Sequence, residues 1–146
     1  MTDDSANSHP DDLDTLRDFG APPSLGEIEE MGRRAYDALP AAFRARCGPV
    51  AIRALDFADA ETLAEMEIDD PFELAGLYRG VPLTERGHDD PTGIDLVFLY
   101  RRAILDWWVE EEMDLEDLIR HLVVHEIGHH FGFSDEEMEA IEDQAD

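Results

Sequence analysis

The sequence predicts an α+β fold, and three observations lead to this prediction. Short apolar runs of about four to eight residues are typical of β-strands. Other segments have apolar residues at spacings of about three or four residues, which is typical of amphipathic helices. One long helical segment is apolar all round, which indicates a buried helix. The chain has 146 residues, of which 43% are hydrophobic, so it accommodates one domain with a core of ordinary size.

The first segment, residues 1–20, is polar and acidic, and Pro10 and Gly20 interrupt it. Such a segment buries too little apolar surface to offset the entropy lost on ordering. We therefore predict a disordered acidic tail over 1–20 and a single folded domain over 21–146.

The first helix is predicted to begin after Ser24, which forms a capping box with Glu27. The apolar residues that follow at helical spacing are Leu25, Ile28, Met31, Ala35 and Leu39. Pro40 ends this helix and opens a short second one. The pair Gly48-Pro49 then breaks the chain.

Three segments are predicted to be strands: 50–57, 74–79 and 94–100. The last, IDLVFLY, is the strongest strand signal in the sequence. Between the first two, Asp59 is predicted to cap a short helix. Residues 80–93 consist largely of turn formers and predict a long exposed loop.

The C-terminal part is predicted to be helical. A short helix over 103–111 contains two tryptophans, which favour packing against the core. Asp114 is predicted to cap the apolar helix that follows, and Gly132 to end it. A last acidic helix is predicted over 135–143.

The charge of the chain limits its partners. The formal net charge is −26, from 37 acidic and 11 basic residues, and every basic residue is Arg. Such a surface repels phosphate backbones, so DNA and RNA are not expected as partners.

Cysteine content and targeting signals indicate the compartment. Cys47 is the only cysteine, so an internal disulfide is excluded, and we expect a buried free thiol. The N-terminus has neither a basic nor an apolar signal region, and no run approaches the length of a membrane span. We expect a soluble, cytoplasmic protein without membrane contacts.

The apolar helix contains the most informative motif, His125-Glu126-Ile127-Gly128-His129. Residues four apart project from the same face of a helix, so His125 and His129 are placed to bind one metal ion. Glu126 is rotated by about 100° from His125, beside the metal position. There it is expected to hold a metal-bound water and to take its proton.

Asp135 is the predicted third ligand. Gly132 tolerates the left-handed conformation that reverses the chain, and Asp135 follows three residues later. Three protein ligands leave a fourth position of zinc for water, as metal-assisted amide hydrolysis requires. Two buried histidines and a glutamate without a metal would instead leave costly unpaired polar groups.

Three stretches together carry a resemblance to a known family: GLYRGVPLTERG (76–87), LYRR (99–102) and HEIGHHFGFSDEEM (125–138). With them, the segment 24–138 resembles the bacterial minimal-zincin family, the small single-domain zincin-like metallopeptidases. The resemblance implies a zincin-like fold, in which a small mixed sheet packs on helices around a buried active-site helix. It also implies one Zn²⁺ per chain.

The resemblance assigns roles to residues as well. It implies His125, His129 and Asp135 as metal ligands and Glu126 as catalytic base. It further implies that the strand 94–100 is a sheet edge that pairs with an extended peptide. The substrate-binding residues expected from this are Ile94, Leu96, Phe98 and Tyr100.

Other candidate residues carry weaker signals. His121 lies one turn before His125 and is expected to be packed or solvated. The alternative is that it supports a metal ligand without binding the metal itself. His88 and His130 are not expected to be ligands, and Met138 is expected to pack in the core. Arginines 101 and 102 are expected to pair with the acidic surface.

Four functions are compatible with these residues. The first is a zinc peptidase acting on a peptide or protein. A metal-dependent RNA hydrolase is disfavoured by the net charge of −26. An Fe(II) site built from two His and one Asp has no need of Glu126. A non-catalytic, metal-stabilised peptide- or protein-binding module is the main alternative, and the oligomeric state is left open.

Overall fold

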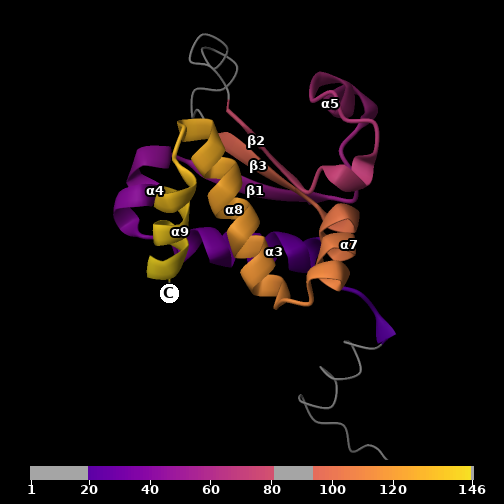
Figure 1. Ribbon diagram of the computed structural model, residues 1–146, viewed down its shortest axis with the longest axis horizontal. Coiled ribbons are helices and arrows are strands. Elements are labelled where there is room, and N and C mark those ends of the chain that lie inside the picture. Colours follow the sequence, from indigo (N-terminus) through magenta and orange to yellow (C-terminus); the bar gives the residue numbers. More distant parts are fainter. Residues whose placement is uncertain (1–19, 81–93, 146) are drawn as a thin grey trace, which may run out of the picture.

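A computed structural model describes residues 20–80 and 94–145. In this part of the chain, six α-helices, a 3₁₀ turn and a three-stranded mixed sheet form an α+β fold, which confirms the predicted fold class (Figure 1). The predicted tail lies outside the described residues except for Gly20. The predicted loop lies outside them except for Gly80.

The first two helices begin and end close to their predicted positions. Helix α3 spans Leu25–Asp37, and α4 spans Ala41–Cys47 directly after Pro40. The capping box is present: Ser24 Oγ accepts the backbone N–H of Glu27 at 3.2 Å, and Glu27 Oε1 accepts the N–H of Ser24 at 2.8 Å. The cap satisfies two backbone donors that the first turn of a helix leaves unpaired.

The sheet contains β1 (Val50–Leu55), β2 (Gly76–Arg79) and β3 (Asp95–Tyr100). Their order is β1-β3-β2, with β1 parallel and β2 antiparallel to β3. The predicted strands thus form, each with slightly shorter bounds than expected.

The prediction that the strand 94–100 is a sheet edge is wrong. Strand β3 is the central strand and pairs on both sides, so its backbone is not open to an added strand. The expectation failed because an apolar run predicts a strand but does not show how many neighbours it pairs with, and here both β1 and β2 pair with β3. The four-residue β2 is the edge strand beside the long helix α8, which spans Leu115–Phe131.

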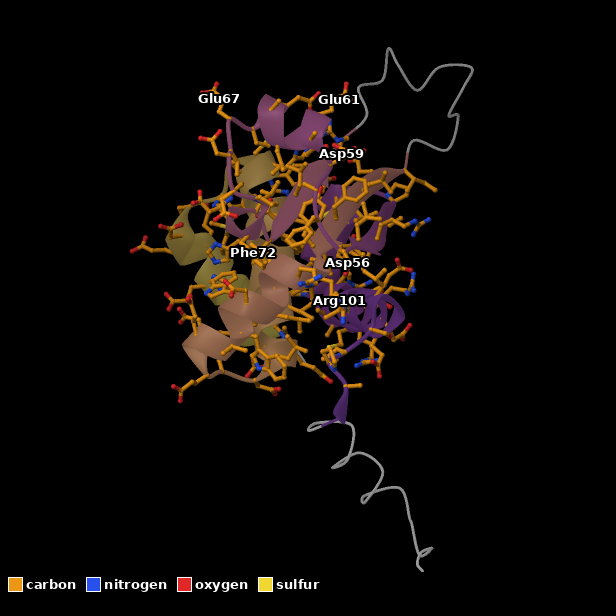
Figure 2. The ribbon with its side chains drawn as sticks, turned by 90° about the vertical axis from the view of Figure 1, so that its right-hand side faces the viewer. Asp56, Asp59, Glu61, Glu67, Phe72 and Arg101 are labelled. Carbon is orange, nitrogen blue, oxygen red and sulfur yellow. The ribbon has the colours of Figure 1, made fainter. Side chains whose placement is uncertain are left out.

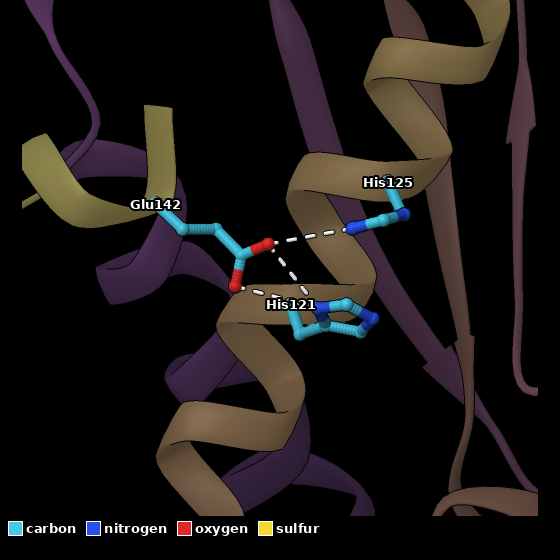
Figure 3. A group of neighbouring side chains, drawn as sticks. All are labelled: His121, His125 and Glu142. Atoms are coloured by element: carbon cyan, nitrogen blue, oxygen red, sulfur yellow. Dashed lines mark hydrogen bonds and ion pairs between the residues drawn. The ribbon is translucent and has the colours of Figure 1, made fainter. Parts of the chain in front are cut away.

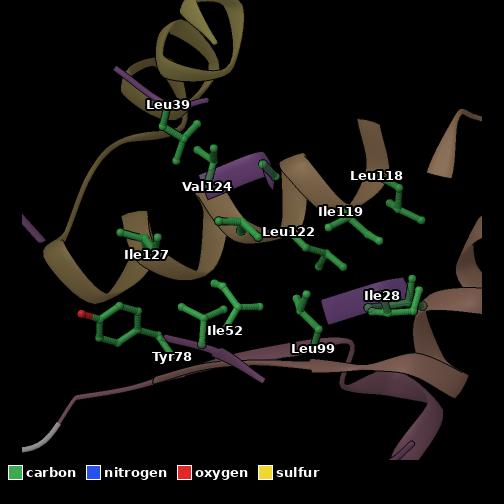
Figure 4. Close-up of a cluster of buried hydrophobic side chains, with 14 of the residues drawn as sticks. Ile28, Leu39, Ile52, Tyr78, Leu99, Leu118, Ile119, Leu122, Val124 and Ile127 are labelled. Atoms are coloured by element: carbon green, nitrogen blue, oxygen red, sulfur yellow. The ribbon is translucent and has the colours of Figure 1, made fainter. Parts of the chain in front are cut away.

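The two faces of the sheet bury different clusters, because successive side chains of a strand alternate between faces. The main core lies between the sheet and helices α3 and α8, where Ile52 and Leu99 meet Leu122 and Ile127 (Figure 4). A smaller cluster on the other face includes Tyr100 and Phe98. That face is the side of α5 (Ala60–Glu65), the 3₁₀ turn η1 (Pro71–Glu73) and α7 (Arg101–Glu111).

Helix α8 runs across the first face and is buried along most of its length. Asp114 occupies its N-cap position, but the carboxylate makes no capping hydrogen bond, unlike the expectation. Gly132 ends the helix at φ 78°, the left-handed conformation that the sequence predicted. The N–H of Phe133 then donates to the carbonyl of Gly128 at 2.8 Å, which fixes the reversal.

Helix α9 (Asp135–Gln144) returns along α8 from this turn (Figure 1). Its Met138 is fully buried, which confirms the expected core role. Cys47 is buried as a free thiol, as predicted, and Trp107 and Trp108 pack partly buried against the core. Through Met138, the fold sets α9 beside the histidines of α8.

Candidate metal centre and active site

Three histidines lie on one side of α8 at intervals of four residues: His121, His125 and His129. The ring centroids of His121 and His125 are 3.9 Å apart, and those of His125 and His129 are 5.8 Å apart. The one-turn spacing therefore brings both His pairs together, as residues four apart on a helix require.

A carboxylate from α9 lies against the first pair. Glu142 Oε2 is 3.2 Å from His121 Nδ1 and 3.4 Å from His125 Nε2 (Figure 3). Among the described residues, His121, His125 and Glu142 form a group of possible metal ligands. Each offers one nitrogen or oxygen atom, and these atoms all lie within 4.8 Å of one another. Imidazole nitrogen and carboxylate oxygen are ligands that zinc prefers, so this donor set fits the metal.

The group opens into a pocket of about 430 Å³ between α8 and α9. Histidine and acidic residues alone line it: His121, His125, Asp135, Glu136, Glu139, Glu142 and Asp143. In the part of the chain that the structure describes, neither Lys nor Arg contributes to this lining. A pocket of such charge favours a divalent cation over an anion.

The predicted ligands are brought together only in part. Asp135, the first residue of α9, lines the same pocket as His125. The ring of His129 lies next to that of His125 but is exposed and does not line the pocket. The three predicted ligand atoms do not meet the 4.8 Å spacing, and the assignment of His125, His129 and Asp135 stays a prediction.

Glu126 projects from a neighbouring face of α8, toward β2 at the edge of the sheet. Its carboxylate accepts a hydrogen bond from the backbone of Tyr78, and its Cγ would lie 3.2 Å from a Cβ added at Gly76. Burial raises the pKa of Glu126 to about 7, and the Tyr78 donor opposes this shift only in part. The glycine leaves the space that this close approach needs.

The register of β2 explains why its backbone reaches Glu126. The N–H of Tyr100 donates to the carbonyl of Ala75, so these residues form a hydrogen-bonded pair. Directly opposed residues of an antiparallel ladder alternate between bonded and non-bonded pairs. Gly76 and Tyr78 are therefore the residues whose backbone groups point away from β3, to the outer edge where Glu126 lies.

Comparison with known families agrees with this geometry. A family model described as a zincin-like metallopeptidase matches residues 47–145, well over half of the chain. The chain belongs to the zincin-like metallopeptidase family. The match runs from the end of α4 through α9, so it includes the whole sheet and every histidine discussed above. Comparison with curated proteins found no match.

In this member of the zincin-like metallopeptidase family, both the hydroxyl group and the ring of Tyr78 make contacts that fix its position. Its hydroxyl donates to Oδ2 of the buried Asp95 at 2.5 Å, and its ring stacks on His130 with centroids 4.0 Å apart. Burial, followed by the carboxylate of Asp95, raises the pKa of Tyr78, so the phenol stays protonated and donates. The stacking also accounts for the position of the His130 ring.

Tyr78→Phe is expected to destabilise the protein by about 1–3 kcal/mol, because a buried carboxylate then loses a donor. Urea unfolding of both proteins measures the difference. Tyr36→Phe, at a partly buried tyrosine of the same core whose hydroxyl bonds the neutral thiol of Cys47, is the comparison for loss of a bond to an uncharged partner. Equal stability of Tyr78→Phe and wild type would show that the hydrogen bond to Asp95 contributes nothing net.

The other predicted substrate residues lie elsewhere. Phe98 and Tyr100 belong to the cluster on the sheet face opposite α8, and Ile94 precedes β3. Leu96 also lies on the paired central strand. With the edge assignment wrong, strand pairing by these four residues has no basis in the structure.

Arg101 pairs with the acidic surface as the sequence predicted, whereas Arg102 contacts an aromatic ring. Arg101 forms an ion pair with Asp56 at 3.0 Å and donates to the carbonyl of Pro23 at 2.6 Å (Figure 2). The guanidinium of Arg102 lies over the ring of Phe57, 5.5 Å from its centroid.

Sequence reasoning missed Glu142 and underrated His121. The signal for His121 was present, since it lies one turn before His125. Glu142 had no distinguishing signal, because it is one of several acids in the last helix.

Among the described helices, none is both long and apolar enough to cross a membrane.

Proposed function

We propose that this zincin-like metallopeptidase is a zinc-dependent peptidase that hydrolyses peptide bonds with Glu126 as general base. The observation that carries the proposal is the place of Glu126: it follows His125 on α8 and holds a carboxylate at the outer edge of β2. A base at that position lies between the histidines and the backbone groups that an extended substrate would approach.

The ligands proposed for the catalytic ion are His125, His129 and Asp135. Zn²⁺ held there would polarise a carbonyl group and lower the pKa of water to about 7. Glu126 takes a proton from the attacking water and passes it to the departing amine. The surroundings of Glu126 bury most of its side chain and thereby keep competing solvent away from its carboxylate.

The substrate is proposed to be a peptide or an extended protein segment. The outer edge of β2 offers the outward N–H and C=O groups of Gly76 and Tyr78, and a peptide added there would lie beside Glu126. Because Glu126 accepts from Tyr78 in the absence of substrate, peptide binding would exchange this hydrogen bond for one to the peptide. This edge replaces β3 as the proposed substrate strand.

A non-catalytic, metal-stabilised binding module is the second candidate. One observation favours it: the tightest ligand group joins α8 to α9 through Glu142 and does not include His129. A metal there would tie the last helix to the fold, as structural sites do.

Cleavage of a mixed peptide library by the zinc-loaded protein tests the two candidates. We expect cleavage products by mass spectrometry, their loss after a chelator removes the metal, and their return when Zn²⁺ is added. The chelator should remove activity because Glu126 alone does not polarise the scissile carbonyl. A zinc-loaded protein that cleaves nothing across the library would favour the binding module.

A further inference from the structure

His125 belongs to two overlapping histidine pairs on α8. It lies four residues after His121 and four residues before His129, so each pair has the one-turn spacing that binds a metal ion. The proposed function uses only the second pair. The first pair has no role in it, although its rings are the closer of the two.

The first pair has its own carboxylate ligand. Glu142 approaches both rings, at 3.2 Å from His121 Nδ1 and 3.4 Å from His125 Nε2 (Figure 3). The side chains are partly buried, with exposed fractions of 38% for His121, 23% for His125 and 22% for Glu142. Two imidazoles and a carboxylate are a complete three-ligand set for zinc.

The two sets exclude one another. A neutral imidazole has one nitrogen that carries a proton and one that accepts, so it offers a single lone pair to a metal. Both sets need that lone pair of His125. An ion held by His121, His125 and Glu142 therefore leaves His129 and Asp135 without their shared partner.

The first set has no acid in the position that Glu126 takes directly after His125. Glu126 is rotated by about 60° from His129 but by about 140° from His121, at about 3.6 residues per turn. The residue that follows His121 is Leu122, which is buried in the core. An ion held between His121 and His125 would thus lie farther from Glu126 along α8 than an ion held between His125 and His129.

We propose that the protein holds one Zn²⁺ in either of two registers that share His125. The His125–His129–Asp135 register is catalytic, and the His121–His125–Glu142 register is silent. Movement of the ion by one helical turn would then switch the enzyme off without loss of the metal. The assignment of the first register rests on the proposed function, whereas the second rests on the geometry between α8 and α9.

Zinc affinity of full-length variants, measured by competition with a chromophoric chelator, tests the silent register. His129→Ala is expected to keep about one Zn²⁺ per chain, because three ligands remain in the other register. Adding His121→Ala or Glu142→Gln to His129→Ala should weaken zinc binding by at least about tenfold. Loss of a residue that only orients a metal ligand already costs about that much affinity, and loss of a ligand itself costs no less. Glu139→Gln in the same background is the matched control, because Glu139 lines the pocket outside the ligand set.

The His121 variant separates a ligand set from an orienting role of Glu142. If Glu142 only positioned His125, His121→Ala would leave the affinity of His129→Ala unchanged. That result, or loss of all zinc binding in His129→Ala, would overturn the proposal. Nitrogen NMR of the imidazoles gives a second readout in the wild type: Zn²⁺ should shift the ring nitrogens of His121, and shifts confined to His125 and His129 would also overturn it.

These measurements are independent of catalysis. A wild type that cleaves no peptide would end the peptidase proposal, yet the affinities of the variants would still establish or exclude the second register. Conversely, a single register in an active enzyme would leave the proposed function intact.

Discussion

Glu126→Gln is expected to lower peptide cleavage by at least about 100-fold while Zn²⁺ stays bound. General base catalysis contributes about 10²–10⁴-fold, and the amide cannot take a proton from water. The substitution keeps the shape of the side chain at the edge of β2, where the close approach to Gly76 leaves little room. The cleavage rate and the zinc content of the same preparation should be measured together.

Glu116→Gln is the matched control for this variant. Glu116 lies on the same helix, exposed, in an ion pair with Arg34 at 3.3 Å. Exposed pairs contribute little to stability, and this one is remote from the histidines, so its loss should leave cleavage unchanged. A Glu126→Gln protein that cleaves at close to the wild-type rate would remove Glu126 from the mechanism.

Met138→Ala is expected to lower the free energy of unfolding by about 2–5 kcal/mol, as truncation of a fully buried large side chain does. Met138 is 0% exposed and packs directly on Gly128 of α8. Zinc affinity should fall as well, because the same helix carries Asp135 and Glu142. Met113→Ala provides the comparison, since Met113 is 37% exposed and its truncation should cost little.

Gly128→Ala examines the same contact from the other side. A Cβ at Gly128 would clash with Sδ of Met138 and lie 2.7 Å from its Cγ, so the buried Met138 side chain or one of the two helices must shift. We expect a destabilisation that exceeds the gain of about 1 kcal/mol in helix propensity. In the Met138→Ala background the clash is gone, and Gly128→Ala should then be neutral or stabilising. Additive effects in this double-mutant cycle would show that the two residues do not restrict one another.

The features that were predicted correctly are encoded within a few residues. The capping box of Ser24 and Glu27, the left-handed turn at Gly132 and the one-turn spacing of His125 and His129 all follow from local geometry. Such interactions join neighbours along the chain, so their partners are visible in the sequence. The family resemblance, which the match over 47–145 confirms, extends this local information to the fold.

Strand order, unlike these local features, depends on residues that are far apart in the sequence. The apolar run IDLVFLY predicts a strand, but an apolar run does not say whether the strand has one neighbour or two. Pairing of β3 with both β1 and β2 joins residues up to 45 positions apart, as in the pair Val50 and Asp95. Only this pairing makes β2 an edge strand of the sheet in the described residues and thereby places Glu126 beside the backbone of Tyr78.

The sequence by itself therefore determined the fold class, the family and the chemical character of the site: histidines one turn apart, a glutamate beside them and a glycine that reverses the chain. The tertiary structure alone decided which edge is open and which acid approaches the histidines. Glu142 is one acid among several in α9, and its contact with His121 and His125 depends on how Met138 seats that helix against Gly128. The packing of two helices fixes the position of a side chain to within the few ångströms that metal ligation requires, and no pattern within either helix contains that information.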